Sequence, residues 1–235
     1  MDISQHIVTE ITEFKEEFNK DRRVRIPNMF SADFANALLK EVANNIKFEN
    51  AFVHNKQPVS VSDEQLDALN ERDRANLKSE IFSYAQNGVG FYYGRCKVSR
   101  ELTHSPLLVQ IYEWLNSQLL FNQIELTTKV SHIKSASAQV TRYNKDCFLT
   151  RHNDVDLKED RKIAYVLNLT PRWHPDWGGL LQFYKQDGTP RDAWAPLFNS
   201  LTLFDVTHVH AVTYVAPYAP MSRYAITGWF NGNQI

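Results

Sequence analysis

The sequence has few cysteines, no long apolar run and no marked excess of charge. Its two cysteines, Cys96 and Cys147, are too few for a disulfide framework or a cysteine zinc site. No run approaches the ~18 apolar residues that a membrane span requires, and residues 1–11 lack the basic-then-apolar pattern of a secretory signal. We therefore expect a cytoplasmic protein with no membrane partner.

The charge balance excludes one class of partner. Lys and Arg number 26 and Asp and Glu number 27, giving a net charge of −1. A chain so balanced does not hold a polyanion by bulk charge, and the sequence gives no direct evidence for a nucleic-acid partner. Its 43% hydrophobic and 12% aromatic content excludes intrinsic disorder.

The length of 235 residues suits one domain with a full core. We predict a single domain over 1–235, in which 1–125 form a helical flank and support and 126–235 form a β-rich core. We find no internal repeat, and the sequence does not indicate an oligomeric state.

The first half carries helical patterns. An apolar stripe over residues 7–18 predicts one helix. Ser31 is a plausible N-cap for a second helix, and residues 62–65 have capping-box spacing for a third, which continues to Ile81. Pro106 fits the first position of a fourth helix. We expect all four helices to be scaffold.

The second half alternates with a period of two. Strands are predicted there over residues 130–133, 138–143, 163–169, 179–184, 201–206 and 224–230. One further short strand, ended by a proline, is predicted in the first half over residues 24–27. Short strands separated by Asn, Asp, Gly and Pro favour an antiparallel sandwich or jelly roll. A parallel sheet would need helices between the strands, and none is readable there.

The first chemical signal is a histidine followed two positions later by an acid. In an extended chain, His152 and Asp154 point to the same face. A later strand brings another histidine, at 208 or 210, which would complete a set of two histidines and one carboxylate. That set is typical of non-heme Fe(II) oxygenases. The alternative is a solvated loop histidine at 152 and ordinary strand histidines at 208 and 210.

Arg223 begins the last predicted strand, 13 residues after His210. Alternation places Arg223 and Thr227 on one face of that strand. A buried arginine requires an anion, because an unpaired buried charge is strongly disfavoured, and its planar guanidinium matches a carboxylate bidentately. A metal face and an inward arginine together suit a dicarboxylate. The alternative is an arginine that faces outward.

With these residues in view, the chain resembles the prolyl hydroxylase branch of the 2-oxoglutarate- and Fe(II)-dependent dioxygenases, and within it the catalytic domain of ribosomal-protein prolyl 3-hydroxylases. The resemblance covers residues 139–232 strongly and the segment from Val24 weakly. Its motifs, in chain order, are residues 152–154, 161–173, 177–181, 201–205, 210–212 and 223–230.

The resemblance implies an α+β protein with a mostly β core: a double-stranded β-helix, which is a cupin-like jelly roll, flanked by N-terminal helices. It implies that His152, Asp154 and His210 bind Fe(II), with His210 preferred over His208 for its His-x-Val context. It also implies that Arg223 binds the distal carboxylate of 2-oxoglutarate.

Three further residues are candidates for cosubstrate binding. Tyr143 stands where the family carries a tyrosine that contacts the cosubstrate, and Thr227 shares the inward face with Arg223. Asn168 stands where relatives carry a second such tyrosine, so either its amide makes a shorter contact or that contact is lost. A carboxylate at Asp154 favours hydroxylation over halogenation.

The implied function is hydroxylation of a prolyl residue in a protein, with decarboxylation of 2-oxoglutarate to succinate and CO₂. Fe(II), 2-oxoglutarate and O₂ are the implied cofactors, and ascorbate is a candidate reductant. The expected partner is a proline-containing protein or peptide, with ribosomal proteins and translation factors as candidates. One alternative is the same chemistry on a free amino acid, another metabolite or another macromolecule. The other is a jelly roll that binds metal or ligand without turnover.

Overall fold

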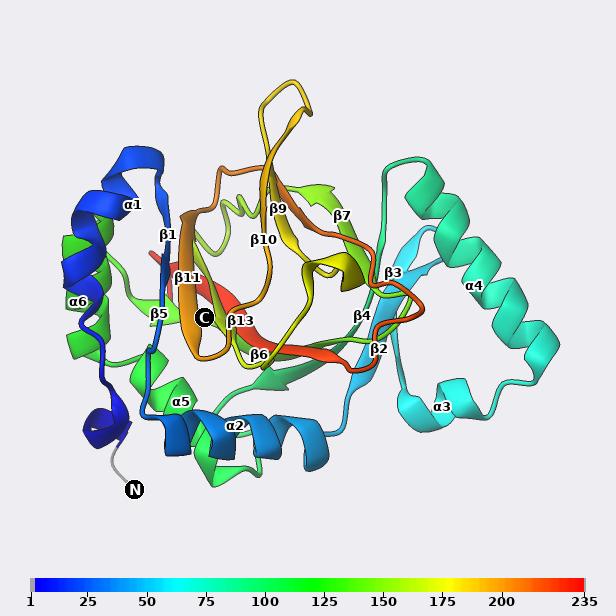
Figure 1. Cartoon of the computed structure of the whole chain (residues 1–235), viewed down its shortest axis with the longest axis horizontal. Helices are drawn as coiled ribbons and strands as arrows, with labels where there is room; N and C mark the ends of the chain where they lie inside the picture. Colours follow the sequence, from blue (N-terminus) through cyan, green and yellow to red (C-terminus); the bar gives the residue numbers. More distant parts are fainter. Residues whose placement is uncertain (1–2, 235) are drawn as a thin grey trace.

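The computed structural model describes residues 3–234, and a curled antiparallel sheet forms its centre (Figure 1). Its strands are β1 (Arg23–Ile26), β2 (Glu49–His54), β3 (Gln57–Ser62), β4 (Phe91–Val98), β5 (Ser135–Ala136), β6 (Ala138–Tyr143), β7 (Phe148–His152), β8 (Arg161–Asn168), β9 (Leu181–Tyr184), β10 (Pro190–Trp194), β11 (Ser200–Asp205), β12 (His210–Val212) and β13 (Arg223–Asn231).

Helices lie mainly in the first half of the chain and flank the sheet (Figure 1). The α-helices are α1 (Lys15–Asp21), α2 (Ala32–Asn44), α3 (Asp63–Asp67), α4 (Glu71–Gln86), α5 (Pro106–Leu115) and α6 (Gln118–Thr128), and the 3-10 helices are η1 (Ile3–His6), η2 (Ile11–Phe14) and η3 (Pro175–Trp177).

The strand order runs β1-β11-β8-β13-β6-β4-β7-β12-β9-β10, with β2, β3 and β5 paired to its side. Each strand pair found in residues 3–234 is antiparallel, as predicted. The two ends of this order meet through side chains. Arg23 of β1 donates to the Asp192 carboxylate of β10 at 2.7 Å, and Arg25 donates to the Ala195 carbonyl just beyond β10 at 2.8 Å. The sheet therefore encloses an interior.

Two apolar layers position that interior. The larger core lies between the helices α1, α2, α5 and α6 and the strands β1, β11, β8, β13 and β6, and it includes Phe18, Leu38, Ile111 and Ile226. A smaller cluster around Phe183 and the neighbouring strands fills part of the interior. The interior is thus backed by a rigid layer, which suits a site that must hold side chains in fixed positions.

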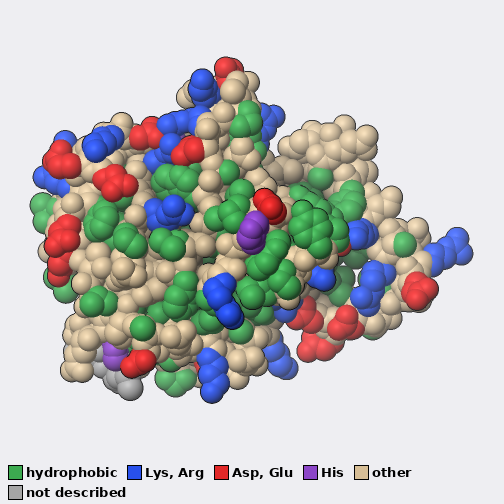
Figure 2. All heavy atoms as spheres, in the orientation of Figure 1, with side chains coloured by type: hydrophobic (Ala, Val, Ile, Leu, Met, Phe, Trp, Pro, Cys, Tyr) green, Lys and Arg blue, Asp and Glu red, His purple; other side chains and the backbone are tan. Residues whose placement is uncertain are grey.

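A separate cluster holds α3 and α4 on the hairpin β2–β3 and on β4. It centres on Phe52, Ile81 and Phe148. In Figure 1 these two helices lie at the right, apart from the other helices. Figure 2 shows the whole molecule in the same orientation. Positive and negative side chains are interspersed on the face that is seen, and hydrophobic side chains gather toward its middle.

Several local predictions hold. The strand predicted at 138–143 is β6, and Pro106 is the first residue of α5. Ser62 and Gln65 form the reciprocal capping box at the start of α3. Ser31 lies at the N-cap of α2, although its side chain makes no capping hydrogen bond.

Other predictions are wrong. Residues 7–18 do not form one helix, because Ile7 makes a β-bridge with Phe30 and the chain then divides into η2 and α1. The helix predicted from the capping box to Ile81 is two helices, α3 and α4. Residues 130–133 are not a strand, since Lys129 adopts a left-handed conformation that ends α6, and the Ile133 N–H donates to the side chain of Glu125 instead of to a strand.

The first half is also less helical than predicted. It holds β2, β3 and β4, and β4 joins the main sheet between β6 and β7. The helical flank extends to the end of α6 at Thr128, three residues beyond the predicted limit of 125. Among the described residues, no helix is long and apolar enough to cross a membrane.

Candidate metal and cosubstrate site

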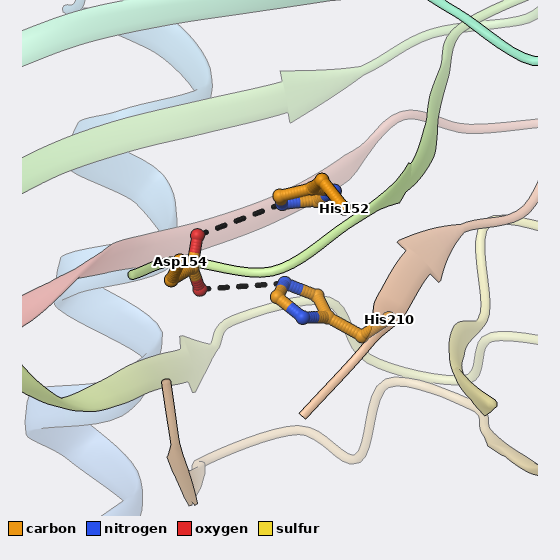
Figure 3. A group of neighbouring side chains, drawn as sticks. All are labelled: His152, Asp154 and His210. Carbon is orange, nitrogen blue, oxygen red and sulfur yellow. Dashed lines mark ion pairs between the residues drawn. The ribbon is translucent and has the colours of Figure 1, made fainter. Parts of the chain in front are cut away.

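Two neighbouring strands bring His152, Asp154 and His210 together (Figure 3). His152 ends β7, and it is the register partner of His210, which begins β12. Asp154 follows β7 by two residues. His152 Nε2 lies 3.6 Å from Asp154 Oδ1, and His210 Nε2 lies 3.4 Å from Asp154 Oδ2. One donor atom from each of the three residues lies within 4.8 Å of the others.

The backbone orients both imidazole rings. Nδ1 of His152 lies 2.9 Å from the Thr150 carbonyl, and Nδ1 of His210 lies 3.0 Å from the His208 carbonyl. Each ring thus donates its Nδ1–H to a carbonyl two residues earlier, which leaves Nε2 with a free lone pair that faces Asp154. The ring of His208 lies elsewhere, with Nε2 2.9 Å from the Asp21 carbonyl.

Charge and burial hold Asp154 and His210 in the ionisation states that suit a metal ligand. Burial lowers the pKa of His210 to about 4, so its imidazole is neutral near pH 7. Burial acts to raise the pKa of Asp154, but the neighbouring imidazoles of His152 and His210 lower it below the usual value. For His152, burial acts to lower the pKa, but the nearby Asp154 carboxylate raises it above the usual value, so a metal ion would have to displace a proton from this ring.

This donor set fits Fe(II). Two imidazoles and one carboxylate on one side of an ion leave further coordination positions open, as in non-heme Fe(II) sites. A structural zinc site would have four protein ligands. Within the part of the chain that the structure describes, these residues are the one group of three or more His, Cys, Asp or Glu side chains close enough to share a metal.

A cavity of about 560 Å³ extends from this cluster into the sheet interior, and Arg223 lies on its wall. Arg223 is only 3% exposed. Its Nε has no hydrogen-bond partner, and its side chain makes no ion pair with any residue of 3–234. Burial lowers the pKa of this guanidinium from its usual value. A buried cation without an anion is costly, so this wall suits an anionic ligand.

Tyr143 and Thr227 lie on the same cavity wall. Arg223 is the register partner of Tyr143 across β13 and β6, and its guanidinium lies 5.3 Å from the ring centre. Burial raises the pKa of Tyr143 well above its usual value, so its hydroxyl remains a hydrogen-bond donor at neutral pH. The Thr227 hydroxyl lies 3.5 Å from Nε2 of Gln139.

Asn168 lies behind Arg223 and does not line the larger cavity. Both residues border a smaller space, to which Arg25 and Thr202 also contribute. The Asn168 amide donates to Ser200 Oγ at 3.3 Å, whereas its Oδ1 is buried without a partner. An unsatisfied buried acceptor is unusual in proteins.

The structure adds cavity residues that the sequence reasoning did not assign to the site. Arg161 lines the cavity and stacks on Trp229, with the guanidinium 3.6 Å from the ring centre. Tyr93 and Arg95 of β4 also line it. Their signal was weak, because β4 itself was not predicted.

Trp173 and Trp177 do not line this cavity. They pack edge to face with ring centres 5.4 Å apart, and Trp173 is 7% exposed and donates its indole N–H to the Gly178 carbonyl at 2.8 Å. The two indole rings therefore pack against each other and not against a ligand in this cavity.

Residues 138–231 match the family model of the 2OG-Fe(II) oxygenase superfamily. This segment of the chain matches a 2OG-Fe(II) oxygenase domain. The matched segment begins with β6 and ends with β13, and it contains the three clustered residues and Arg223. Proteins of this family use Fe(II), 2-oxoglutarate and O₂, and the cluster fits the iron.

The chain is similar to proteins named as prolyl hydroxylases, as the sequence motifs predicted. The chain is 26% identical over 188 residues to "Prolyl 3-hydroxylase OGFOD1" of Xenopus laevis; the match covers 77% of this chain but 34% of that protein. The chain therefore spans about a third of the length of this curated relative.

Solved structures share the fold. A Pseudomonas putida prolyl-4-hydroxylase matches with a TM-score of 0.64 at 16% identity, over 95% of this chain and 100% of the other. A Trichoplax adhaerens prolyl hydroxylase, solved with a hypoxia inducible factor peptide fragment, matches with a TM-score of 0.65 at 18% identity, over 95% and 91%. Together with the curled antiparallel sheet, these matches confirm the predicted jelly roll with flanking helices.

Proposed function

We propose that this chain is an Fe(II)- and 2-oxoglutarate-dependent dioxygenase that hydroxylates a prolyl residue of a protein. The observation that carries the proposal is the shared cavity. It has two imidazoles and a carboxylate at one place and a buried, unpaired guanidinium on its wall. A dicarboxylate that chelates a metal at one end needs both features.

Each side chain has a definite task in this proposal. His152, Asp154 and His210 hold Fe(II) through Nε2, a carboxylate oxygen and Nε2. Arg223 pairs with the distal carboxylate of 2-oxoglutarate, whose binding satisfies the charge that is otherwise buried alone.

Two hydroxyl groups complete the cosubstrate pocket. Tyr143 and Thr227 offer hydroxyls from the strands beside Arg223. Asn168 borders a small space together with Arg223, and neither the Oδ1 of Asn168 nor the Nε of Arg223 has a hydrogen-bond partner. Bound Fe(II) and 2-oxoglutarate supply the oxidative chemistry: O₂ is consumed, 2-oxoglutarate becomes succinate and CO₂, and one oxygen atom enters the substrate.

The prolyl substrate rests on the similarity to proteins named as prolyl hydroxylases. A ribosomal protein or translation factor is the finer proposal, carried over from the resemblance to ribosomal-protein prolyl 3-hydroxylases. We propose a cytoplasmic location on the same basis.

Succinate formation from 2-oxoglutarate tests the enzymatic part. We expect the wild-type protein with Fe(II) and ascorbate to release succinate and the His152→Ala variant to release at most a small fraction of it. Mn(II) titration without oxygen should show that the variant binds the metal at least about tenfold more weakly. Equal succinate release by both proteins would remove His152 from the site.

Mass spectrometry tests the substrate. In cells that lack the gene, we expect a ribosomal or elongation-factor protein to lose the mass of one oxygen atom at a proline. If succinate forms but no proline differs between the strains, the chemistry stands and the substrate class changes.

A further inference from the structure

A second hollow of about 660 Å³ adjoins the metal cavity. Phe82 and Ala85 of α4 form one wall, and Val212 and Tyr214, at the end of β12 and just beyond it, form the other. Residues 148–151 of β7 form the floor. Most of this lining is apolar. We call this hollow the α4–β12 groove.

The groove is continuous with the metal cavity. Leu149, Thr150, Arg151 and Val212 line both hollows. These residues belong to the two strands that carry the candidate metal ligands. A chain bound in the groove therefore runs directly toward His152.

The walls of the groove are held in place by polar contacts at one end. Lys78 of α4 donates to the Asp146 carboxylate at 2.6 Å, and the Tyr214 hydroxyl donates to the same carboxylate. Phe82 also packs edge to face on Tyr214, with ring centres 6.1 Å apart. Tyr214 nevertheless remains 44% exposed, so its apolar surface is available to a ligand.

We propose that the α4–β12 groove is a subsite for a polypeptide substrate, which binds in an extended conformation with an apolar side chain in the groove. This inference rests on the proposed function, because it places the hydroxylated residue at the metal. It adds a requirement on the amino-acid sequence of the substrate: an apolar residue at a fixed spacing from the hydroxylated residue.

The spacing follows from strand geometry. Phe148 and Leu149 precede His152 by four and three positions, which is about 10–13 Å along a strand. An extended substrate covers the same distance in the same number of residues. The apolar anchor is therefore expected three or four positions from the hydroxylated residue.

The charge of Arg151 limits which substrate residues fit between the apolar side chain in the groove and the hydroxylated residue. Arg151 lies at the junction of the two hollows and makes no ion pair with the residues that the structure describes; its contacts are the Gly188 carbonyl at 3.4 Å and the Tyr184 ring. Lys or Arg at the intervening substrate positions would meet this uncompensated charge and is expected to be disfavoured.

The test uses a library of dodecapeptides with a fixed central proline and randomised flanks. The full chain, loaded with Mn(II) and N-oxalylglycine to prevent turnover, captures peptides that are then sequenced. We expect enrichment of Leu, Ile, Met or Phe three or four positions from the proline, and depletion of Lys and Arg between.

A matched pair of variants on one helix assigns the enrichment. Ala85→Arg places a long cation in the groove, whereas Ala75→Arg makes the same change on an exposed part of α4. We expect Ala85→Arg to weaken capture of an enriched peptide by about tenfold or more, because the arginine keeps the apolar side chain of the peptide from being buried in the groove. We expect Ala75→Arg to capture the same peptide as well as the wild-type protein does. Thermal unfolding checks that both variants fold.

Three results would overturn the inference: no positional preference in the wild-type protein, equal loss in both variants, or a dimer in sedimentation that Ala85→Arg dissociates, which would assign the groove to a second copy of the chain. Succinate release from 2-oxoglutarate is followed in parallel. Its absence together with positional enrichment would reject the proposed chemistry and leave the groove as a peptide site.

Discussion

Arg223 serves ligand binding in the proposed function but lowers the stability of the ligand-free protein. Its guanidinium is buried without an anion, so we expect Arg223→Leu to unfold at a higher temperature in the absence of ligand, with a gain of about 1 kcal/mol or more. The same variant should bind 2-oxoglutarate about 100-fold more weakly in the Mn(II)-loaded protein, because a charge-assisted pair is lost. Calorimetry measures both quantities.

Arg223→Lys is the control, since it keeps the charge but not the planar fork. It should retain part of the affinity and gain little stability. Unchanged 2-oxoglutarate affinity in the leucine variant would place the cosubstrate elsewhere.

Asp63 provides a test of electrostatics away from the site. Arg142 of β6 donates to both of its oxygens, at 2.6 and 3.0 Å, and these bonds, together with one from Asn50, lower the pKa of Asp63. A depressed folded-state pKa gives stability that is present above the unfolded value of about 4 and is lost as the pH falls through the folded value. Asp63→Asn should therefore be less stable at neutral pH.

Urea unfolding over a range of pH measures this effect. The difference between wild type and Asp63→Asn should shrink as the pH falls below about 4. A difference that stays constant with pH would mean that the carboxylate charge contributes nothing.

Among the site residues, the sequence predicted those whose relative positions depend only on neighbouring residues in the chain. His152 and Asp154 were paired because i and i+2 share a face. The choice of His210 over His208 came from the resemblance, because it depends on the register of β12 against β7. The surroundings of Asn168 depend on four strands and could not be read from the chain.

At the scale of elements, local capping was readable and sheet partners were not. Pro106 is the first residue of α5, as predicted, and Ser105 before it accepts from the Leu108 N–H at 3.3 Å. The strands β2–β4 were missed because much of their surface packs on α3 and α4, so that clean alternation is absent. The need for glycine at position 178 was also not predictable from the sequence. Its φ is 68°, and a Cβ there would lie 1.9 Å from the carbonyl oxygen of Tyr214. Tyr214 is distant in the chain and approaches Gly178 only in the folded protein.

Two serines at helix starts allow a matched test of capping. Ser105→Ala should cost about 1 kcal/mol of unfolding free energy, since it removes the side-chain cap of a buried helix. Ser31→Ala should cost less, because Ser31 makes no capping bond to α2 and its hydroxyl contacts His6 instead. Chemical denaturation compares them, and equal costs would contradict the assignment of the cap.

At the scale of the molecule, the sheet is curled and its two ends are joined by Arg23. The side chain of Arg23 is 8% exposed and pairs with Asp21 and Asp192 at 2.6 and 2.7 Å. Its guanidinium also lies 4.4 Å from the centre of the Phe183 ring. Phe183 is in turn the register partner of His210, so the closure of the sheet supports a candidate metal ligand.

We therefore expect Arg23→Leu to affect both stability and metal binding. Loss of the two ion pairs should lower the free energy of unfolding by about 2–3 kcal/mol. The loss is smaller than for a fully buried pair, because the two acids are partly exposed and regain water. Mn(II) affinity should also fall, because β9 and β12 lose support on one side. Arg191→Leu is the control: Arg191 contacts Asp21 from a more exposed position and should leave the metal affinity unchanged. Equal Mn(II) affinity in both variants would show that the site is held by β7 and β12 alone.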